Sequence, residues 1–238
     1  MKHQLSALER QALLDKEKYE KQLKEIAAKQ EAEVKELNNL KDVNKIKEAE
    51  EKIFLNFLNK LKSFPVMNPL PKHEGYRYVG IIGENSAGKS SLLNFVLGLQ
   101  LEVGVDDTTQ DIEKVHVDAS SKLAYFDSPG LNQTINITHA ECLKAFYTID
   151  IMFIASSVTF KNVIRSIQVM NKINPPKLYL VRNQCDKFRT DAELMKCKEK
   201  DRKVLQGCGV NRPILYVSTI KDDSFMDNAQ FKKLVKGQ

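Results

Sequence analysis

Apolar residues follow two different patterns along the chain. Up to residue 64 they recur at helical spacing among lysines and glutamates, in a segment without glycine or proline. This stripe departs from a strict heptad, which favours two or three antiparallel helices, with a bend near Asn38 and Asn39, over one long parallel coiled coil. The apolar face formed by Phe54, Phe57 and Leu58 is expected to pack on the domain that follows.

After this region, short apolar runs alternate with helical patterns. Strands are predicted at 76–83, 112–118, 122–127, 149–155, 177–183 and 214–218, and helices at 90–99, 160–173, 192–206 and 229–236. Such alternation predicts an α/β domain whose mostly parallel sheet is covered on both faces and binds ligands at the carboxyl ends of its strands. We therefore divide the chain into an N-terminal helical region (1–64), a proline-rich linker (65–75) and an α/β domain (76–238).

Composition narrows the functional classes only slightly. The chain has 238 residues, 42% of them hydrophobic, which excludes a wholly disordered protein. A net charge of +6 suits anionic ligands or acidic membranes, and without interleaved basic and aromatic residues we predict no nucleic-acid partner. The four cysteines show no paired spacing, which favours reduced structural thiols in a cytoplasmic protein. No apolar run reaches the length of about 20 residues that crosses a bilayer.

A glycine-rich segment joins the first predicted strand to its helix and has the GxxxxGK[ST] pattern of a phosphate-binding loop. Backbone amides that open onto a helix N-terminus converge on an anion. Lys89 is expected to reach the β- and γ-phosphates, and the Ser90 hydroxyl to ligate Mg²⁺. The nucleotide-binding residues predicted here are Gly83, Glu84, Asn85, Ser86, Ala87, Gly88, Lys89, Ser90 and Ser91.

Two further motifs fit a phosphate and metal site. Asp127 and Gly130 form a DxxG pattern at the end of a strand, where the acid can hold the magnesium shell and the glycine amide can meet the γ-phosphate. Thr109, with Thr108 as the alternative, precedes this region where a switch threonine would grip Mg²⁺ when the γ-phosphate is present. We predict Lys89, Thr109, Asp127 and Gly130 as catalytic residues, and Ser90, Thr109 and Asp127 as metal ligands.

The choice between purines rests on the NQxD sequence Asn183, Gln184, Cys185 and Asp186, a relative of the NKxD element by which GTPases read guanine. A carboxylate at Asp186 can accept from both the N1 and N2 hydrogens of guanine, and adenine offers no such donor pair. Asn183 would tie this loop to the phosphate loop, and Gln184 would lay its aliphatic stem along the base. Ser218 and Thr219 follow the next strand, where GTPases contact the guanine carbonyl.

Together these motifs resemble a translation-factor-class GTPase domain. The strings GENSAGKSSLLN, YFDSPGLNQT and KLYLVRNQCDKF are most similar to the immunity-related, interferon-inducible GTPases. This resemblance implies binding of GTP or GDP with Mg²⁺, GTP hydrolysis linked to homo-oligomerisation, and peripheral contact with internal membranes, often around pathogens. That family usually continues into a C-terminal helical domain, so the end at Gln238 indicates a truncated or divergent member.

Leu131 stands where small GTPases have a water-orienting glutamine, which predicts slow basal turnover. A second subunit, or Gln133 or Glu84 rearranged on self-association, could supply the missing group. Two alternatives stay open: a nucleotide-binding scaffold that hydrolyses negligibly and acts through its N-terminal helices, and an ATPase in which Asp186 is incidental.

Overall fold

The computed structural model describes residues 43–61, 73–98, 100–101, 116–127, 148–220 and 226–237, with scattered helical positions between 11 and 35. The elements, in chain order, are α2 (Val43–Leu61), β1 (Arg77–Gly83), α3 (Lys89–Leu97), β2 (His116–Asp118), β3 (Leu123–Asp127), β4 (Ile151–Ser156), η1 (Phe160–Val163), α5 (Ile164–Ile173), β5 (Lys177–Arg182), η2 (Cys185–Lys187), α6 (Asp191–Gly207), β6 (Ile214–Tyr216) and α7 (Asn228–Lys236).

The six strands form one sheet in the order β2-β3-β1-β4-β5-β6. All neighbouring pairs are parallel except β2 and β3, which are antiparallel. The central strand β4 is buried along its whole length, and β1 is buried at every residue after its first, which explains their nearly continuous apolar sequences. The prediction of an α/β domain with a mostly parallel sheet is confirmed.

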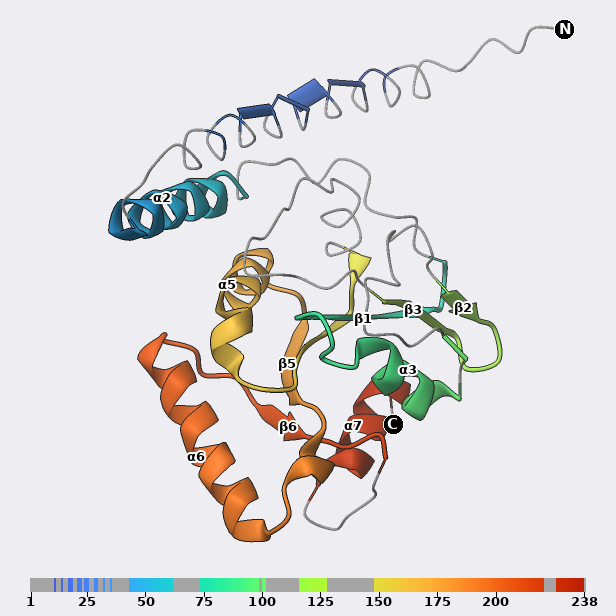
Figure 1. The fold of residues 1–238 in the computed structure, drawn as a ribbon. Coiled ribbons are helices and arrows are strands. Elements are labelled where there is room, and N and C mark those ends of the chain that lie inside the picture. Colours follow the sequence, from blue (N-terminus) through green and yellow to red (C-terminus); the bar gives the residue numbers. More distant parts are fainter. Residues whose placement is uncertain are drawn as a thin grey trace, which may run out of the picture.

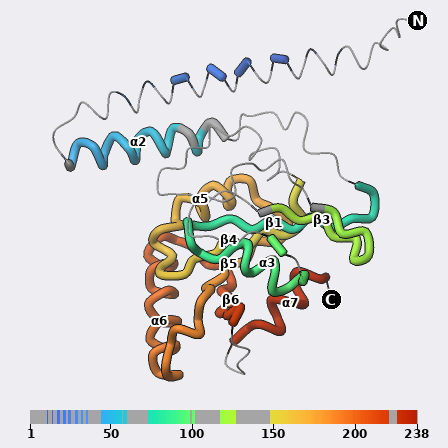
Figure 2. Tube along the Cα trace, turned by 45° about the vertical axis from the view of Figure 1, so that its right-hand side comes forward, coloured from blue at the N-terminus to red at the C-terminus, as the bar shows by residue number. Residues whose placement is uncertain are grey.

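Helices cover both faces of this sheet (Figure 1). On one face α2, α5 and α6 enclose a core that includes Phe126, Met152 and Phe160. On the other, α3 and α7 pack on a second core that includes Phe153 and Phe231. In Figure 2 the strands run between these two groups of helices. Because β1, β3, β4, β5 and β6 are parallel, their carboxyl ends meet at one edge of the sheet, where the predicted site residues are concentrated.

The boundaries of the described elements agree with the sequence patterns to within a few residues, with two differences in kind. The 3₁₀ turn η2 was not predicted, and one predicted helix starts differently. The predicted helix at 160–173 begins as a 3₁₀ turn, η1, and becomes α-helical at Ile164. Thr159 explains this start, since its side chain accepts a hydrogen bond from the amide of Lys161 at 3.4 Å. The predicted strand at 112–118 is described only from His116, because residues 111–115 lie outside the described part of the chain.

Helix α2 packs on the α/β domain, as its apolar face led us to expect. Phe54 and Leu58 are both 5% exposed and belong to the core beneath α5. The Arg165 guanidinium lies 5.0 Å from the centroid of the Phe54 ring and pairs with Glu51 at 3.6 Å. The predicted bend at 38–39 lies outside the described residues, and so does the side chain of Phe57. Among the helices that the structure describes, none is both long and apolar enough to cross a bilayer.

Phe54→Ala is expected to lower the free energy of unfolding by about 3 kcal/mol, because it removes a buried ring and leaves a cavity under α5. Urea denaturation followed by circular dichroism would measure the change. The matched control is Leu55→Ala on the same helix, since Leu55 is 47% exposed and should cost less than about 0.5 kcal/mol. If the two substitutions lowered the free energy of unfolding equally, α2 would not be docked through Phe54.

Candidate nucleotide-binding site

The loop between β1 and α3 wraps tightly, and two glycines make the wrap possible. A Cβ at Gly83 would lie 2.2 Å from the carbonyl oxygen of Ala155 on β4, so a larger residue would force the strands apart. Gly88 has a φ of +75°, and a Cβ there would lie 2.5 Å from Nδ2 of Asn183. Both ends of the loop therefore require the absence of a side chain, which supports the phosphate-loop interpretation of this sequence.

Helix α3 begins directly after the loop and presents an N-terminus suited to an anion. Its N-cap residue, Gly88, makes no side-chain cap, and its first turn contains no acidic residue. The outward-pointing amides of such a turn carry partial positive charge. Lys89 is only 8% exposed, and its Nζ donates to the carbonyl oxygen of Glu84 at 3.3 Å. Ser90 stands on the same turn and offers the hard oxygen ligand that Mg²⁺ prefers. This donor set fits a polyphosphate with its metal ion.

The middle of the loop places its side chains in contrasting surroundings. Glu84 is half-buried, and its carboxylate is bonded to the end of β4 and to η1 rather than turned toward the phosphate cradle. The Oδ1 atom of Asn85 is buried without a hydrogen-bond partner among the described residues, an acceptor that a water, a ligand donor or a cation would satisfy. Ser86 is exposed, and its φ is 60°. The side chain of Glu84 is thus held by hydrogen bonds, whereas the side chain of Ser86 is exposed to solvent.

Asn183, at the end of β5, joins the phosphate loop to the predicted base-recognition loop. Its Nδ2 atom donates to the carbonyl oxygen of Ala87 at 2.9 Å and to that of Gly88 at 3.5 Å. Its own amide donates to the carbonyl oxygen of Ser156 at 2.9 Å. The side chain is 2% exposed, so these bonds are shielded from water. Two segments nearly one hundred residues apart are therefore held at one edge of the sheet.

Gln184 adopts a left-handed backbone conformation with a φ of 59°. Its Nε2 atom donates to the carbonyl oxygen of Ser86 at 3.1 Å, and its Oε1 atom accepts from Nζ of Lys187. The side chain therefore reaches across to the phosphate loop by its amide. Its stem lies between the two loops, and the predicted contact of that stem with a base stays a prediction.

Asp186 and Ser218 come together at the ends of β5 and β6. The Ser218 hydroxyl donates to Oδ1 of Asp186 at 2.6 Å, and the Ser218 amide donates to Oδ1 of Asn228 at 3.0 Å. The loops are also joined by the amide of Cys185, which donates to the carbonyl oxygen of Val217 at 3.1 Å. Ser218 is fully buried and Asp186 is partly exposed, so one carboxylate oxygen is fixed while the group keeps access to solvent. Thr219 follows on the same loop.

Several predicted site residues lie outside the described part of the chain. Thr109, its alternative Thr108, and Gly130 are among them, as are Leu131 and Gln133. Asp127 is described as the last residue of β3, paired in register with Ile81 of β1, which places it at the same edge of the sheet as the phosphate loop. The roles assigned to these residues stay predictions.

Sequence reasoning missed a buried polar cluster behind the base-recognition loop. Arg182 lies 3.7 Å from Asp201, measured from Nε to Oδ2, and its terminal nitrogen donates to Sγ of Cys197 at 3.4 Å. Burial raises the pKa of Asp201 and of Cys197 despite the nearby guanidinium, and it raises the pKa of Cys185 to about 12. The i, i+4 spacing of Cys197 and Asp201 could have indicated that these two side chains lie on one face of a helix. Nothing in the sequence linked that pair to Arg182.

The cysteines are expected to differ sharply in reactivity. Cys208 is exposed, whereas Cys185 and Cys197 are buried with raised pKa values, so at pH 8 their thiolates are scarce as well as shielded. Iodoacetamide should label Cys208 at least ten times faster than either buried thiol, and urea should remove the difference. Peptide mass spectrometry resolves the sites individually. Rapid labelling of Cys185 in the folded protein would contradict the packing described here.

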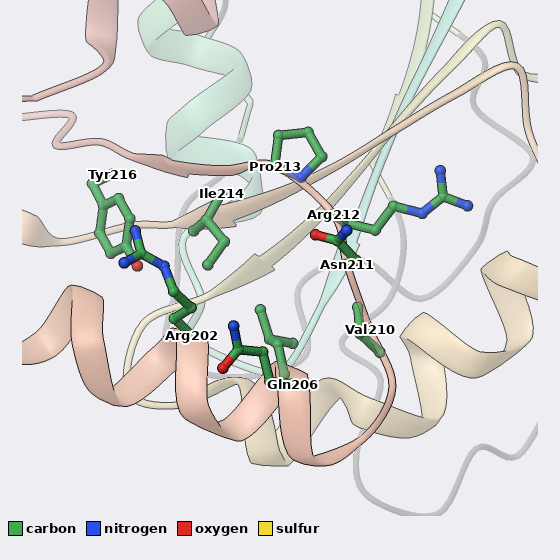
Figure 3. Close-up of a pocket in the computed structure, with 9 residues that line it drawn as sticks. Arg202, Gln206, Val210, Asn211, Arg212, Pro213, Ile214 and Tyr216 are labelled. Atoms are coloured by element: carbon green, nitrogen blue, oxygen red, sulfur yellow. The ribbon is translucent and has the colours of Figure 1, made fainter.

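A separate pocket of about 250 Å³ lies between α6 and the segment that leads into β6 (Figure 3). Its lining includes Arg202, Gln206, Asn211 and Tyr216. None of the predicted site residues contributes to it. The segment before a parallel strand lies at the edge of the sheet opposite the phosphate loop, so this pocket is not part of the candidate site.

Known proteins provide an independent comparison. Residues 78–204 match the sequence model of the family described as 50S ribosome-binding GTPase. Among solved structures, Era in complex with MgGDPNP and a segment of 16S ribosomal RNA is 18% identical, covers 69% of this chain and 57% of its own, and superposes with a TM-score of 0.51.

Two other structures are similar at lower scores. NFeoB from S. thermophilus, in a variant bound to GDP and aluminium fluoride, is 18% identical over 68% of this chain and 64% of its own, with a TM-score of 0.47. Bacterial selenocysteine-specific elongation factor EF-Sec is 13% identical over 68% of this chain and 28% of its own, also with a TM-score of 0.47. This chain thus spans less than two thirds of each of these proteins. No curated protein sequence matches significantly.

The sheet is mostly parallel, and a glycine-rich loop leads from β1 into α3. Asn183 ties this loop to the segment that carries Asp186, which pairs with Ser218. These features together define a P-loop GTPase domain. Because the family model covers more than half of the chain, we conclude that the chain belongs to the 50S ribosome-binding GTPase family. The finer resemblance of the sequence, to the immunity-related GTPases, stays a proposal.

Proposed function

We propose that this chain binds GTP with Mg²⁺ at the described edge of the sheet and hydrolyses it to GDP and phosphate. The observation that carries the proposal is the 2.9 Å hydrogen bond from Asn183 to the carbonyl oxygen of Ala87. This bond ties the loop that bears Asp186 to the phosphate loop that leads into Lys89, so one ligand could contact both residues. A triphosphate on the first turn of α3 and a guanine at Asp186 can then belong to the same molecule.

The residues divide into those that hold the phosphates and those that select the base. The amides of the loop and of α3, together with Lys89, would bind and orient the β- and γ-phosphates. A bound Mg²⁺ would supply charge neutralisation at those phosphates, held by Ser90 and, as we propose, by Asp127 and Thr109. Asp186 would accept from the N1 and N2 hydrogens of guanine with its two oxygens, and the Ser218 hydroxyl, which donates to Oδ1, would hold the carboxylate in place.

Hydrolysis adds a water molecule to the γ-phosphorus and releases GDP. Positioning and charge stabilisation provide most of the rate enhancement in such transfers. Leu131 offers no group that orients the water, and the Glu84 carboxylate is engaged elsewhere, so the isolated chain should turn over slowly.

Two finer proposals rest on the sequence resemblance to immunity-related GTPases. Self-association would bring a second copy to the nucleotide and supply the missing water-orienting group, and the assembled protein would contact internal membranes peripherally from the cytoplasm. The alternative, a nucleotide-binding scaffold that acts through its N-terminal helices, is favoured by Leu131 and by the docking of α2 on α5.

The test is GTP turnover per chain, measured as phosphate release over a wide range of protein concentrations. Turnover that rises with concentration supports activation by self-association. A constant, non-zero value would remove that part of the proposal and keep the GTPase activity. Phosphate release no faster than from a Lys89→Ala chain would leave the scaffold function.

A further inference from the structure

Glu84 is a carboxylate in a loop whose other features favour an anion. It directly follows Gly83, the last residue of β1, and three donors meet its two oxygens. The Ser156 hydroxyl and the Ser157 amide donate to Oε1 at 2.8 and 3.0 Å, and Nδ2 of Asn162 donates to Oε2 at 2.7 Å. These three bonds hold both oxygens of the Glu84 side chain in place.

The three donors belong to the end of β4 and to the 3₁₀ turn η1. Ser156 is fully buried at the last position of β4, and Asn162 lies within η1. Main-chain pairing between β1 and β4 ends one residue earlier, at Gly83 and Ala155. Glu84 thus continues the connection between these strands by a side chain, beyond the point where the backbone ladder stops.

The backbone carbonyl of Glu84 contacts Lys89, which we predict to be a catalytic residue. Its carbonyl oxygen accepts from Nζ of Lys89 at 3.3 Å while its side chain is fixed to β4 and η1. Displacement of Glu84 would therefore move both the entry to the loop and the contact that Lys89 makes with it. We propose that Glu84 is a positioning residue that holds the phosphate loop in its nucleotide-binding conformation, an inference that rests on the proposed GTP binding.

Glu84 is expected to affect the affinity for GTP in two opposite ways. Its negative charge repels a triphosphate by Coulomb's law, so charge alone predicts that removing it tightens binding. Its three hydrogen bonds hold the loop in place, so anchoring predicts that removing it weakens binding. The anchoring effect is the larger, because the carboxylate is fully hydrogen-bonded away from the cradle and a flexible loop would have to be ordered again by each ligand.

Substitutions at Glu84 separate these effects. Glu84→Ala should weaken binding of fluorescent GTP and GDP alike by about tenfold, because charge-assisted hydrogen bonds are lost and the loop is released. Glu84→Gln removes the charge and the acceptor for Asn162 but keeps an acceptor for Ser156 and Ser157, so its affinities for GTP and GDP should stay within about threefold of wild type. Asn162→Ala should weaken binding about threefold and add little in a Glu84→Ala background, since both act through one contact.

The matched control is Glu199→Ala, which removes an exposed glutamate paired with Lys203 on α6. It should leave the affinities for GTP and for GDP unchanged. Thermal unfolding of every variant shows whether it is folded; should Glu84→Ala fail to fold, Glu84→Gln and Asn162→Ala decide. A folded Glu84→Ala chain that binds GTP as tightly as wild type, or more tightly, would overturn the inference. A wild-type chain with no affinity for GTP would instead contradict the proposed function on which it rests.

Discussion

Replacing Lys89 with alanine is expected to weaken binding of GTP and GDP by roughly 30- to 3,000-fold, or about 2 to 5 kcal/mol. The expected size of the loss follows from burial: the side chain is 8% exposed, so its charge would meet the phosphates in a region shielded from water. Alanine would leave the phosphate charge without its cationic partner. Isothermal titration of the full chain with each nucleotide in Mg²⁺ measures the loss.

Lys203→Ala provides the control for this experiment. Lys203 is an exposed lysine on α6 that pairs with Glu199 at 2.7 Å, far from the phosphate loop in sequence, and its removal should change affinity by less than twofold. If Lys89→Ala bound GTP within threefold of wild type, the loop would not be the phosphate site.

Asp186→Ala is expected to abolish discrimination between guanine and adenine. Guanine would give the wild-type carboxylate two hydrogen-bond donors that adenine does not have, so the carboxylate would add affinity for guanine nucleotides and little for adenine nucleotides. Affinity for GTP should fall about 100-fold, whereas affinity for ATP should change less than threefold, so that the two nucleotides bind nearly alike. Competition against a fluorescent nucleotide measures both.

Two variants sharpen this second prediction. Asp191→Ala removes an exposed aspartate at the start of α6, five residues further on, and should leave the GTP preference intact. Ser218→Ala keeps the carboxylate but removes the hydroxyl that fixes Oδ1, so it should reduce GTP affinity by about tenfold. A Ser218→Ala effect larger than that of Asp186→Ala would mean that the serine, not the aspartate, reads the base.

Where local chemistry decides a structure, the sequence was sufficient to predict it. The segment from β1 through the loop to α3 was predictable because a buried strand, a glycine-rich turn and a helix start follow one another within about twenty residues. Parallel strands could be assigned from their continuous apolar runs and the helices between them. The class of site followed from the order of the motifs along the chain.

Contacts between distant segments were not predictable in the same way. Glu84 meets Ser156 and Asn162 across separations of 72 and 78 residues, and no spacing rule relates such positions. The Arg182–Asp201 pair depends on how α6 lies against β5, which is decided by side-chain packing in the core. The change from a 3₁₀ turn to α5 also depends on a local hydrogen bond that the Thr159 side chain accepts from the Lys161 amide and that competes with helical pairing.

The most direct test of the central claim is the affinity of the full wild-type chain for GTP, GDP and ATP, measured side by side in the presence of Mg²⁺. We predict that GTP and GDP bind at least about 100-fold more tightly than ATP, because only guanine can pair with Asp186. Equal affinities, or tighter binding of ATP, would contradict the assignment of this domain as a guanine-nucleotide site.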